Sequence, residues 1–345
     1  MKTLKIKDIC DKGSSALKQK DVEGQEGKYP VYGASGYISS IDTYHQDKDY
    51  IAIVKDGSGI GRVTFMPAYS SVIGTMQYIL PKEGYNIKYI SYCLQSLDLS
   101  KYKQGAAIPH IYFRDYGERY VNIEESLPEQ ERIVSLLDAE FAKIDAIKAN
   151  AEKQLQDAKA LFQSALKDYL TPKEGWKYLP FEKSIVKVKK QKSIKSKDYK
   201  EVGQYPVVSQ ESSLISGYFD DGSILYQHDT PVVIFGDHTQ NVKYVDFDFI
   251  VGADGVHILS PIAEITPKFF YYQLKSIKLR NLGYARHYKL LKEESIGYPP
   301  LPEQERIVSL LDGLSAKIHA LQSNFDTTVT LCNDLKQSIL KDIFG

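Results

Sequence analysis

The sequence LPEQERIVSLLD occurs twice in this chain, at residues 127–138 and at residues 301–312, and this repeat decides the fold. The two copies lie 174 positions apart, and the sequence AKI recurs at the same offset at residues 142–144 and 316–318. Self-similarity at a fixed offset indicates a structural unit that occurs more than once. The chain of 345 residues is therefore predicted to be a tandem duplication, in which a helical segment follows a globular segment in each unit.

Apolar residues follow each repeated sequence in steps of three and four, which is the spacing of a coiled-coil seam. The predicted seam consists of Ile133, Leu137, Phe141, Ile144, Ala151, Leu155, Ala158, Phe162, Ala165 and Tyr169 in the first copy and of Ile307, Leu311, Leu314, Ile318, Leu321, Phe325, Thr328, Cys332, Leu335 and Ile339 in the second. Because neither stripe can stay in water, we expect the two helices to pair with each other, antiparallel and within the chain. Each helix would be about 60 Å long, and the pair would place the globular segments at opposite ends of a rigid rod. Ser126 and Glu129 are predicted to form a capping box at the first helix start.

The two globular segments share a framework and differ in their loops. Tyr-Pro-Val occurs at residues 29–31 and again at residues 205–207. A strand-like apolar run that ends beside a glycine follows in both segments. The predicted fold class is α+β, with two mixed α/β domains separated by two long helices that form an antiparallel intramolecular coiled coil. The predicted bounds are 1–126 and 171–300 for the globular domains and 127–170 and 301–345 for the helical segments.

Positive charge is concentrated outside the predicted helices, although the formal net charge of the chain is zero. Residues 124–170 contain ten acidic and six basic residues, and residues 301–345 contain six acidic and four basic residues. The globular segments are therefore net basic. Lysine neutralises phosphate without reading sequence, whereas Arg, Gln, Asn and aromatic side chains on loops read bases. This distribution favours a nucleic-acid partner, while a run of lysines taken alone is more typical of a solvated surface.

The sequence lacks the common motifs of nucleotide-dependent and metal-dependent enzymes. Residues 57–61 (GSGIG) have the look of a nucleotide loop, but residues 62–66 then show a strand pattern where a dinucleotide site needs a helix. The seven histidines show no metal-ligand spacing, and no P-loop or amino-methyltransferase motif occurs. We therefore predict a binding protein with no catalytic residues, no metal site and no cofactor of its own.

The cysteines Cys10, Cys93 and Cys332 show neither disulfide nor zinc spacing, which favours a reducing compartment. No apolar run approaches the roughly 20 residues that a membrane-spanning helix needs. The opening sequence MKTLKIKDIC lacks the apolar core of a signal peptide. We expect a cytoplasmic protein without a membrane partner.

The arrangement resembles the specificity subunits of type I restriction-modification systems. The resemblance rests on two copies of L-P-x-Q-x-x-I, at residues 127–133 and 301–307, each of which begins a long helix after a variable domain. The loop GAAIPHI at residues 105–111 is also similar to a loop near the end of the family's target recognition domains. The second domain has YARH at residues 284–287 in this place and lacks the proline. The match covers the whole chain.

The resemblance implies a non-catalytic subunit that binds double-stranded DNA. Each recognition domain would read one half of an asymmetric two-part site, and the antiparallel helices would fix the unread gap. Two modification subunits would bind the helical region and bring S-adenosylmethionine and adenine methylation, with the target adenine flipped into their own pocket. Restriction subunits would bring translocation and cleavage that depend on ATP and Mg.

Candidate DNA-contacting residues are chosen by residue type and loop position. They are Lys55, Arg62, Lys103, Gln104, His110 and Arg114 in the first domain and Lys190, Lys192, His238, Gln240, Arg280, Tyr284, Arg286 and His287 in the second. The alternative from another class is a coiled-coil assembly protein whose globular ends bind protein or sugar. A DNA reader differs from it in losing affinity steeply with ionic strength, by about one log-log slope unit per phosphate contact. A related system with a fused methylase and nuclease would differ only in its partner genes.

Overall fold

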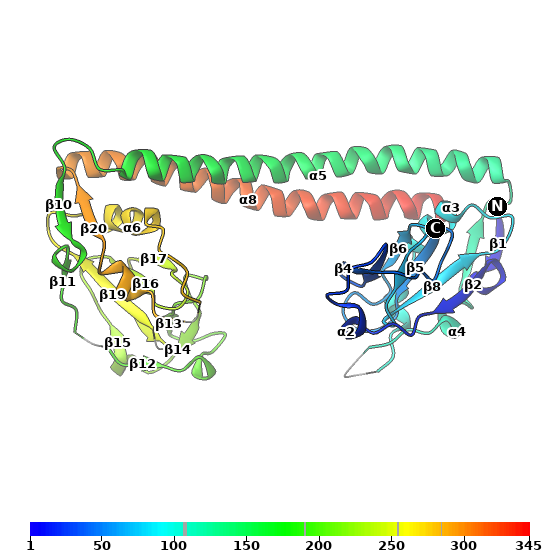
Figure 1. Ribbon diagram of the computed structural model, residues 1–345, viewed down its shortest axis with the longest axis horizontal. Coiled ribbons are helices and arrows are strands. Elements are labelled where there is room, and N and C mark those ends of the chain that lie inside the picture. The colour runs from blue at the N-terminus through cyan, green and yellow to red at the C-terminus, as the bar shows by residue number, and fades with distance from the viewer. Residues whose placement is uncertain (106–108, 190, 254, 284) are drawn as a thin grey trace. The chain divides into compact units, whose positions relative to one another are not determined.

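The computed structural model describes residues 1–105, 109–189, 191–253, 255–283 and 285–345 (Figure 1). The chain divides into two compact units, each with its own apolar core. The first unit comprises Met1–Ala151 and Phe325–Gly345, and the second comprises Glu152–Asn324. Each unit therefore contains one globular domain together with part of each long helix.

The globular part of the first unit is built on two small sheets. The larger sheet is antiparallel and has the strand order β2 (Cys10–Ser14), β8 (Met76–Pro81), β5 (Tyr50–Val54), β6 (Val63–Met66). The smaller sheet has the order β4 (Gly36–Ile41), β3 (Tyr29–Gly33), β7 (Ser71–Val72). β1 (Lys2–Lys5) pairs with β9 (Tyr120–Ile123) just before the long helix. The helical segments are α1 (Ile6–Ile9), α2 (Gln19–Val22), α3 (Ile87–Gln95), η1 (Leu99–Tyr102) and α4 (Phe113–Tyr116).

The globular part of the second unit repeats this construction. Its antiparallel sheet has the order β11 (Ile185–Val186), β19 (Val256–Pro261), β16 (Val232–Gly236), β17 (Val242–Val245). The other sheet has the order β12 (Ser193–Ile194), β18 (Phe249–Gly252), β13 (Tyr205–Val208), β14 (Gly217–Phe219), with β15 (Leu225–Tyr226) also on β18. β10 (Lys177–Pro180) pairs with β20 (Ser295–Tyr298). The helical segments are η2 (Phe181–Lys183), η3 (Ser196–Asp198), η4 (Gly222–Ile224), α6 (Pro267–Ser276) and α7 (Tyr288–Leu291).

The central strand of each four-stranded antiparallel sheet is buried along its whole length, because α3 or α6 covers one face and the second sheet covers the other. β5 and β16 have no exposed residue, and both are rich in β-branched residues, as strands of this kind require. Ile51 and Ile53 pack with Ile90 of α3, while Ala52 and Val54 belong to a separate apolar cluster on the other face. The prediction of two mixed α/β domains on one framework is confirmed.

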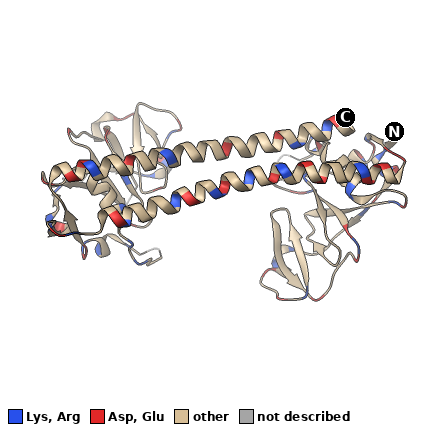
Figure 2. Cartoon of the chain, turned by 90° about the horizontal axis from the view of Figure 1, so that it is seen from above, with Lys and Arg blue, Asp and Glu red and all other residues tan. Residues whose placement is uncertain are grey.

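The long helices α5 (Leu127–Leu170) and α8 (Leu301–Phe344) each contain 44 residues. In the first unit the beginning of α5 packs on the end of α8, where Cys332 Sγ lies 3.7 Å from the carbonyl oxygen of Ile144. In the second unit the end of α5 packs on the beginning of α8, and Lys159 Nζ donates to Gln322 Oε1 at 3.0 Å. The two helices therefore run antiparallel within each unit, as predicted. Figure 2 shows acidic and basic residues interspersed along both of them.

The predicted seam is wrong at Leu335, which is 49% exposed. The last turns of α8 contact the first globular domain as well as α5, and Leu340 and Phe344 are buried there. The ring centroid of Phe344 lies 5.1 Å from that of Tyr89 on α3. Because the buried face of α8 follows this second contact, Leu335 lies outside it.

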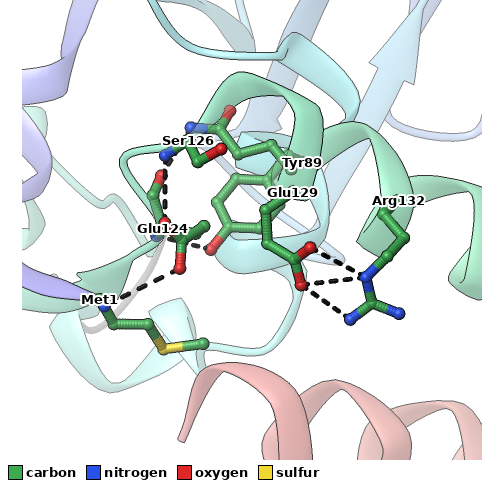
Figure 3. Close-up of polar contacts among 7 residues, drawn as sticks. Met1, Tyr89, Glu124, Ser126, Glu129 and Arg132 are labelled. Atoms are coloured by element: carbon green, nitrogen blue, oxygen red, sulfur yellow. Dashed lines mark hydrogen bonds and ion pairs between the residues drawn. The ribbon is translucent and has the colours of Figure 1, made fainter.

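The predicted capping box at the start of α5 is also wrong (Figure 3). The backbone N–H of Ser126 donates to Glu124 Oε1 at 3.0 Å, so Glu124 supplies the carboxylate expected from Glu129. Glu129 instead forms an ion pair with Arg132 one turn further along, at 2.7 Å. The spacing of three residues that forms a capping box also permits this pairing along the helix surface.

Among the described residues, no helix is long and apolar enough to cross a membrane.

Candidate nucleic-acid interface

The start of each long helix is fixed to its globular domain by a buried glutamine of the repeated sequence. Gln130 Oε1 accepts from the N–H of Asn86 at 2.7 Å, and Gln130 Nε2 donates to the carbonyl oxygen of Glu124 at 2.6 Å. Gln304 has the same position in the second unit, where its Oε1 accepts from the N–H of Thr266 at 2.8 Å. Asn86 and Thr266 are the residues that cap α3 and α6. These contacts with the caps of α3 and α6 explain why both copies of the repeated sequence have a glutamine at this position.

Two turns further along each helix, an aspartate makes a second repeated contact. Asp138 accepts hydrogen bonds from the Tyr92 hydroxyl and from Lys88 Nζ, the latter at 3.0 Å. These hydrogen bonds hold the pKa of Asp138 below its ordinary value, although partial burial acts in the opposite direction. In the second unit Asp312 accepts from the Tyr272 hydroxyl and lies 3.5 Å from Lys268 Nζ. Each globular domain is therefore held on its helix at two points.

In the first domain, a loop from later in the chain returns to the end of β5. The N–H groups of Lys55 and Asp56 both point at the carbonyl oxygen of Thr75, at 3.0 and 3.2 Å, so the strand ends in an irregular turn. His110 Nδ1 lies 2.6 Å from Asp56 Oδ1, and the N–H of Gly57 donates to the carbonyl oxygen of Pro109. Asp56 therefore positions His110, which is one of the predicted site residues. Asp56 itself was not predicted as a site residue.

Three more of the predicted residues lie around this contact, and a fourth, Arg62, lies in the turn that follows β5. Gln104 exchanges two backbone hydrogen bonds of 2.8 Å with His110, and its side chain donates to Asp115 Oδ2 at 2.8 Å. Arg114 stacks on the Tyr112 ring at 4.5 Å and lies 3.6 Å from Asp115. Lys103 is exposed in the same loop, and Arg62 is exposed in the turn between β5 and β6. The glycine-rich residues 57–61 form that turn.

In the second domain, the equivalent loop returns to Asp237, which follows β16. The N–H and the Nδ1–H of His287 both donate to the carbonyl oxygen of Asp237, at 2.8 and 2.9 Å. His287 Nε2 accepts from the N–H of Leu282 at 2.9 Å, which requires a neutral ring with the proton on Nδ1. His287 is fully buried. Its predicted contact with DNA does not fit this burial, and its position is that of a residue that shapes the loop.

The buried carboxylate of Asp237 gathers further residues of this loop. It accepts from the N–H of Tyr288 at 2.7 Å and lies 3.4 Å from His257 Nε2. The imidazole of His257 stacks on the Tyr288 ring at 3.7 Å. Burial lowers the pKa of His257, although Asp237 opposes the shift. Arg286, 3.9 Å from Asp237, keeps an exposed side chain, so a cation lies at the surface of this cluster.

The turn between β16 and β17 carries His238 and Gln240 next to the Asp237 cluster, and it packs on a second loop at residues 209–216. The N–H of His238 donates to Gln210 Oε1 at 3.0 Å. Lys243 holds the second loop through a hydrogen bond of 2.7 Å from its Nζ to the carbonyl oxygen of Ser209. Burial lowers the pKa of Lys243 to about 8. A single lysine in a strand gives no local sign of such burial, so the sequence did not reveal this residue.

The other predicted residues of the second domain are Lys192, Arg280, Lys190 and Tyr284. Lys192 and Arg280 are exposed. Lys190 and Tyr284 lie outside the described residues.

A group of tyrosines in the first domain was not predicted as part of the site. The ring centroid of Tyr44 lies 4.8 Å from that of Tyr29 and 5.2 Å from that of Tyr69, and Tyr69 is 53% exposed.

Comparison with known proteins places this architecture in a family. The family model for the type I restriction modification DNA specificity domain matches residues 1–157 and 174–329. The chain is also similar to the specificity subunit of the type I restriction enzyme EcoR124I/EcoR124II of Escherichia coli, with 31% identity over 87 residues. That stretch covers 24% of the chain and 22% of the relative, so the chain spans about a fifth of the length of the curated relative that it matches.

One solved structure, which describes complex assembly and conformational transition of a type I R-M system, agrees with this assignment at the level of the fold. It matches with a TM-score of 0.71 and 16% identity, over 98% of this chain and 96% of that chain. The S subunit of the type I restriction-modification system from M. genitalium matches with a TM-score of 0.48 and 16% identity, over 100% of this chain and 96% of that chain. The tandem match of the family model covers most of the sequence, and the chain belongs to the type I restriction-modification DNA specificity family.

Proposed function

We propose that this chain is the non-catalytic subunit that reads the DNA sequence for a type I restriction-modification complex. One observation carries the proposal: both globular domains hold a late loop against residues that directly follow their central strand, and the side chains around that contact differ. The first domain presents the exposed Lys103 and Arg114 there, and the second presents the exposed Arg286 and the partly exposed Gln240. One construction with two sets of polar side chains suits the reading of two different base sequences.

The predicted partners follow from this proposal. Double-stranded DNA would bind both domains, each at one half of a two-part site. The methylation and cleavage chemistry, with S-adenosylmethionine, ATP and Mg, would belong to modification and restriction subunits.

Exposed leucines that recur on the long helices support the recruitment of two modification subunits. Leu136 and Leu310 occupy equivalent positions of the repeat and are 47% and 40% exposed. Leu161 and Leu335 are also equivalent and are 60% and 49% exposed. The first unit therefore carries Leu136 and Leu335, and the second unit carries their equivalents Leu310 and Leu161. Large apolar side chains exposed at repeated positions are typical of protein interfaces, and two copies fit two identical partners.

Salt dependence of DNA binding tests the DNA-reading proposal. For the full chain in complex with its modification subunit, the logarithm of the affinity for duplex DNA should fall linearly with the logarithm of salt concentration. Lys103→Ala should lower the magnitude of that slope by about one unit. Lys12→Ala, which removes an exposed lysine of β2 away from the loops, is the matched control and should leave the slope unchanged. An affinity for DNA that does not vary with salt would favour the coiled-coil assembly protein instead.

A further inference from the structure

The turn between β16 and β17 contains a glutamine in an unusual backbone conformation. Gln240 has a φ of +58°, which lies in the left-handed region that residues other than glycine rarely adopt. Among described residues other than glycine, only Tyr69 and Ala253 also have a positive φ. Glycine would form the same turn without steric strain, so the stability of the turn does not account for the glutamine.

This turn is fixed from one side by Gln210. The carbonyl oxygen of Gln210 accepts from Thr239 Oγ1 at 2.6 Å and from Asn241 Nδ2 at 2.9 Å. A Cβ on Gly236 would lie 2.8 Å from Gln210 Cβ, so the turn and the loop that carries Gln210 approach as closely as glycine allows. The backbone of the turn is therefore held in place before any ligand binds.

The other side of the turn is fixed by the Asp237 cluster. The carbonyl oxygen of Asp237 accepts two hydrogen bonds from His287, and its carboxylate accepts one from the N–H of Tyr288. Asp237 is 3% exposed. Because a rigid turn loses little conformational entropy on binding, a side chain at its tip can make a specific contact at low cost.

The side chain of Gln240 is partly exposed, and its amide neither donates a hydrogen bond to another described residue nor accepts one from it. Its donor and its acceptor are therefore both available to a ligand. Arg286 lies beside the turn with an exposed guanidinium, which favours a nearby phosphate. A glutamine amide that offers a donor and an acceptor side by side matches N7 and N6 of adenine in the major groove.

We propose that Gln240 reads one adenine of the second half-site through a bidentate pair of hydrogen bonds. This inference rests on the proposed function and adds to it the residue and the base. The backbone strain at Gln240 and the rigidity of its turn serve to present the amide to the groove. Arg286 contributes phosphate affinity without distinguishing bases.

The test uses Gln240→Gly in the full chain with its modification subunit, because glycine suits the left-handed backbone while the substitution removes the side chain that carries the amide. We expect the variant to fold with an unchanged or higher midpoint of thermal unfolding. Its affinity for the cognate site should fall by roughly 10- to 100-fold, and the preference for adenine should relax at one position of the second half-site. The first half-site should be read as before.

The matched control is Tyr69→Gly, which relieves the same kind of backbone strain in the first domain and should leave the second half-site unchanged. A Gln240→Gly variant with unchanged selectivity, beside a wild-type protein that does select its sequence, would overturn this inference alone. Relaxation at a G·C position would overturn it as well. A wild-type complex that binds all duplexes equally would overturn the proposed function together with the inference.

Discussion

Lys243 is a lysine that the fold keeps almost entirely out of water. It is 6% exposed, and its ammonium group donates to the carbonyl oxygens of Ser209 and Ser213. Burial lowers its pKa from 10.5 to about 8, because the charged form loses hydration. The unfolded chain exposes this side chain and keeps the proton up to a higher pH. Between about pH 8 and pH 10.5 the unfolded state therefore binds more protons, and this group adds stability as the pH rises.

Comparison with Lys243→Met tests this at the residue scale. The free energy of unfolding of the wild type minus that of the variant should increase with pH above about pH 8, by at most about 1.4 kcal/mol per pH unit. Denaturant titrations of both proteins at several pH values measure this difference directly. A difference that stays constant or falls as the pH rises would contradict the assigned burial of the charge.

Individual site residues were predicted from the sequence only where their surroundings are local. Gln104 is exposed in a loop and Arg114 is exposed on α4, as residue type alone suggests, and their contact with DNA stays a prediction. The burial of His287 depends on Asp237, which lies 50 residues earlier in the chain. The residues next to His287 in the sequence therefore do not indicate that it is buried. Lys243 was missed for the same reason, because the carbonyl groups that accept its hydrogen bonds come from a separate loop.

At the scale of elements, the attachment of each helix to its domain depends on the buried glutamine of the repeated sequence. Gln130→Ala would leave the N–H of Asn86 and the carbonyl oxygen of Glu124 without their partner in a buried setting. Loss of such contacts costs about 2–3 kcal/mol. We expect a decrease of this size in the free energy of unfolding of the unit that contains Gln130, measured by chemical denaturation.

The control for this prediction is Glu131→Ala, which changes the exposed neighbour in the same turn and should alter the free energy of unfolding by less than about 0.5 kcal/mol. Gln304→Ala should reproduce the effect in the second unit, because Gln304 makes the equivalent contacts. Equal stability of Gln130→Ala and Glu131→Ala would show that the glutamine does not hold the junction.

The helices could be predicted because the spacing of apolar residues by three and four is visible in one sequence without any comparison. The exposure of single residues and the hydrogen bonds at the helix start could not be predicted, because the spacing identifies an apolar face and does not tell which element covers it. Leu335 continues the stripe but lies exposed where α8 also packs on the globular domain. The capping box failed because Glu124, two residues before the cap, takes the hydrogen bond that Glu129 was expected to accept. Both errors arise from contacts with a neighbouring element.

At the scale of the whole molecule, the duplication predicts two equivalent sites for partner subunits. Leu136→Glu together with Leu310→Glu should leave DNA binding intact and weaken association with modification subunits at least tenfold, because each places a charge in an apolar contact. Leu136→Glu alone should remove one of the two copies. The mass of the purified complex measures the number of copies bound.

The matched control for the leucine variants is Ser135→Glu with Ser309→Glu, which adds the same charge at the neighbouring exposed positions. This control should assemble as the wild type does. Full assembly of the leucine variants would exclude these residues from the partner interface.

The measurement that tests the central claim most directly is a genome-wide map of adenine methylation in cells that carry a modification subunit and this chain. The account predicts methylation at one two-part sequence with a constant gap, and no methylation in cells that lack only this chain. Gln240→Gly should alter the methylated sequence in one half only, because each domain reads its own half. Methylation that persists unchanged without the chain would contradict its assignment as the subunit that reads DNA.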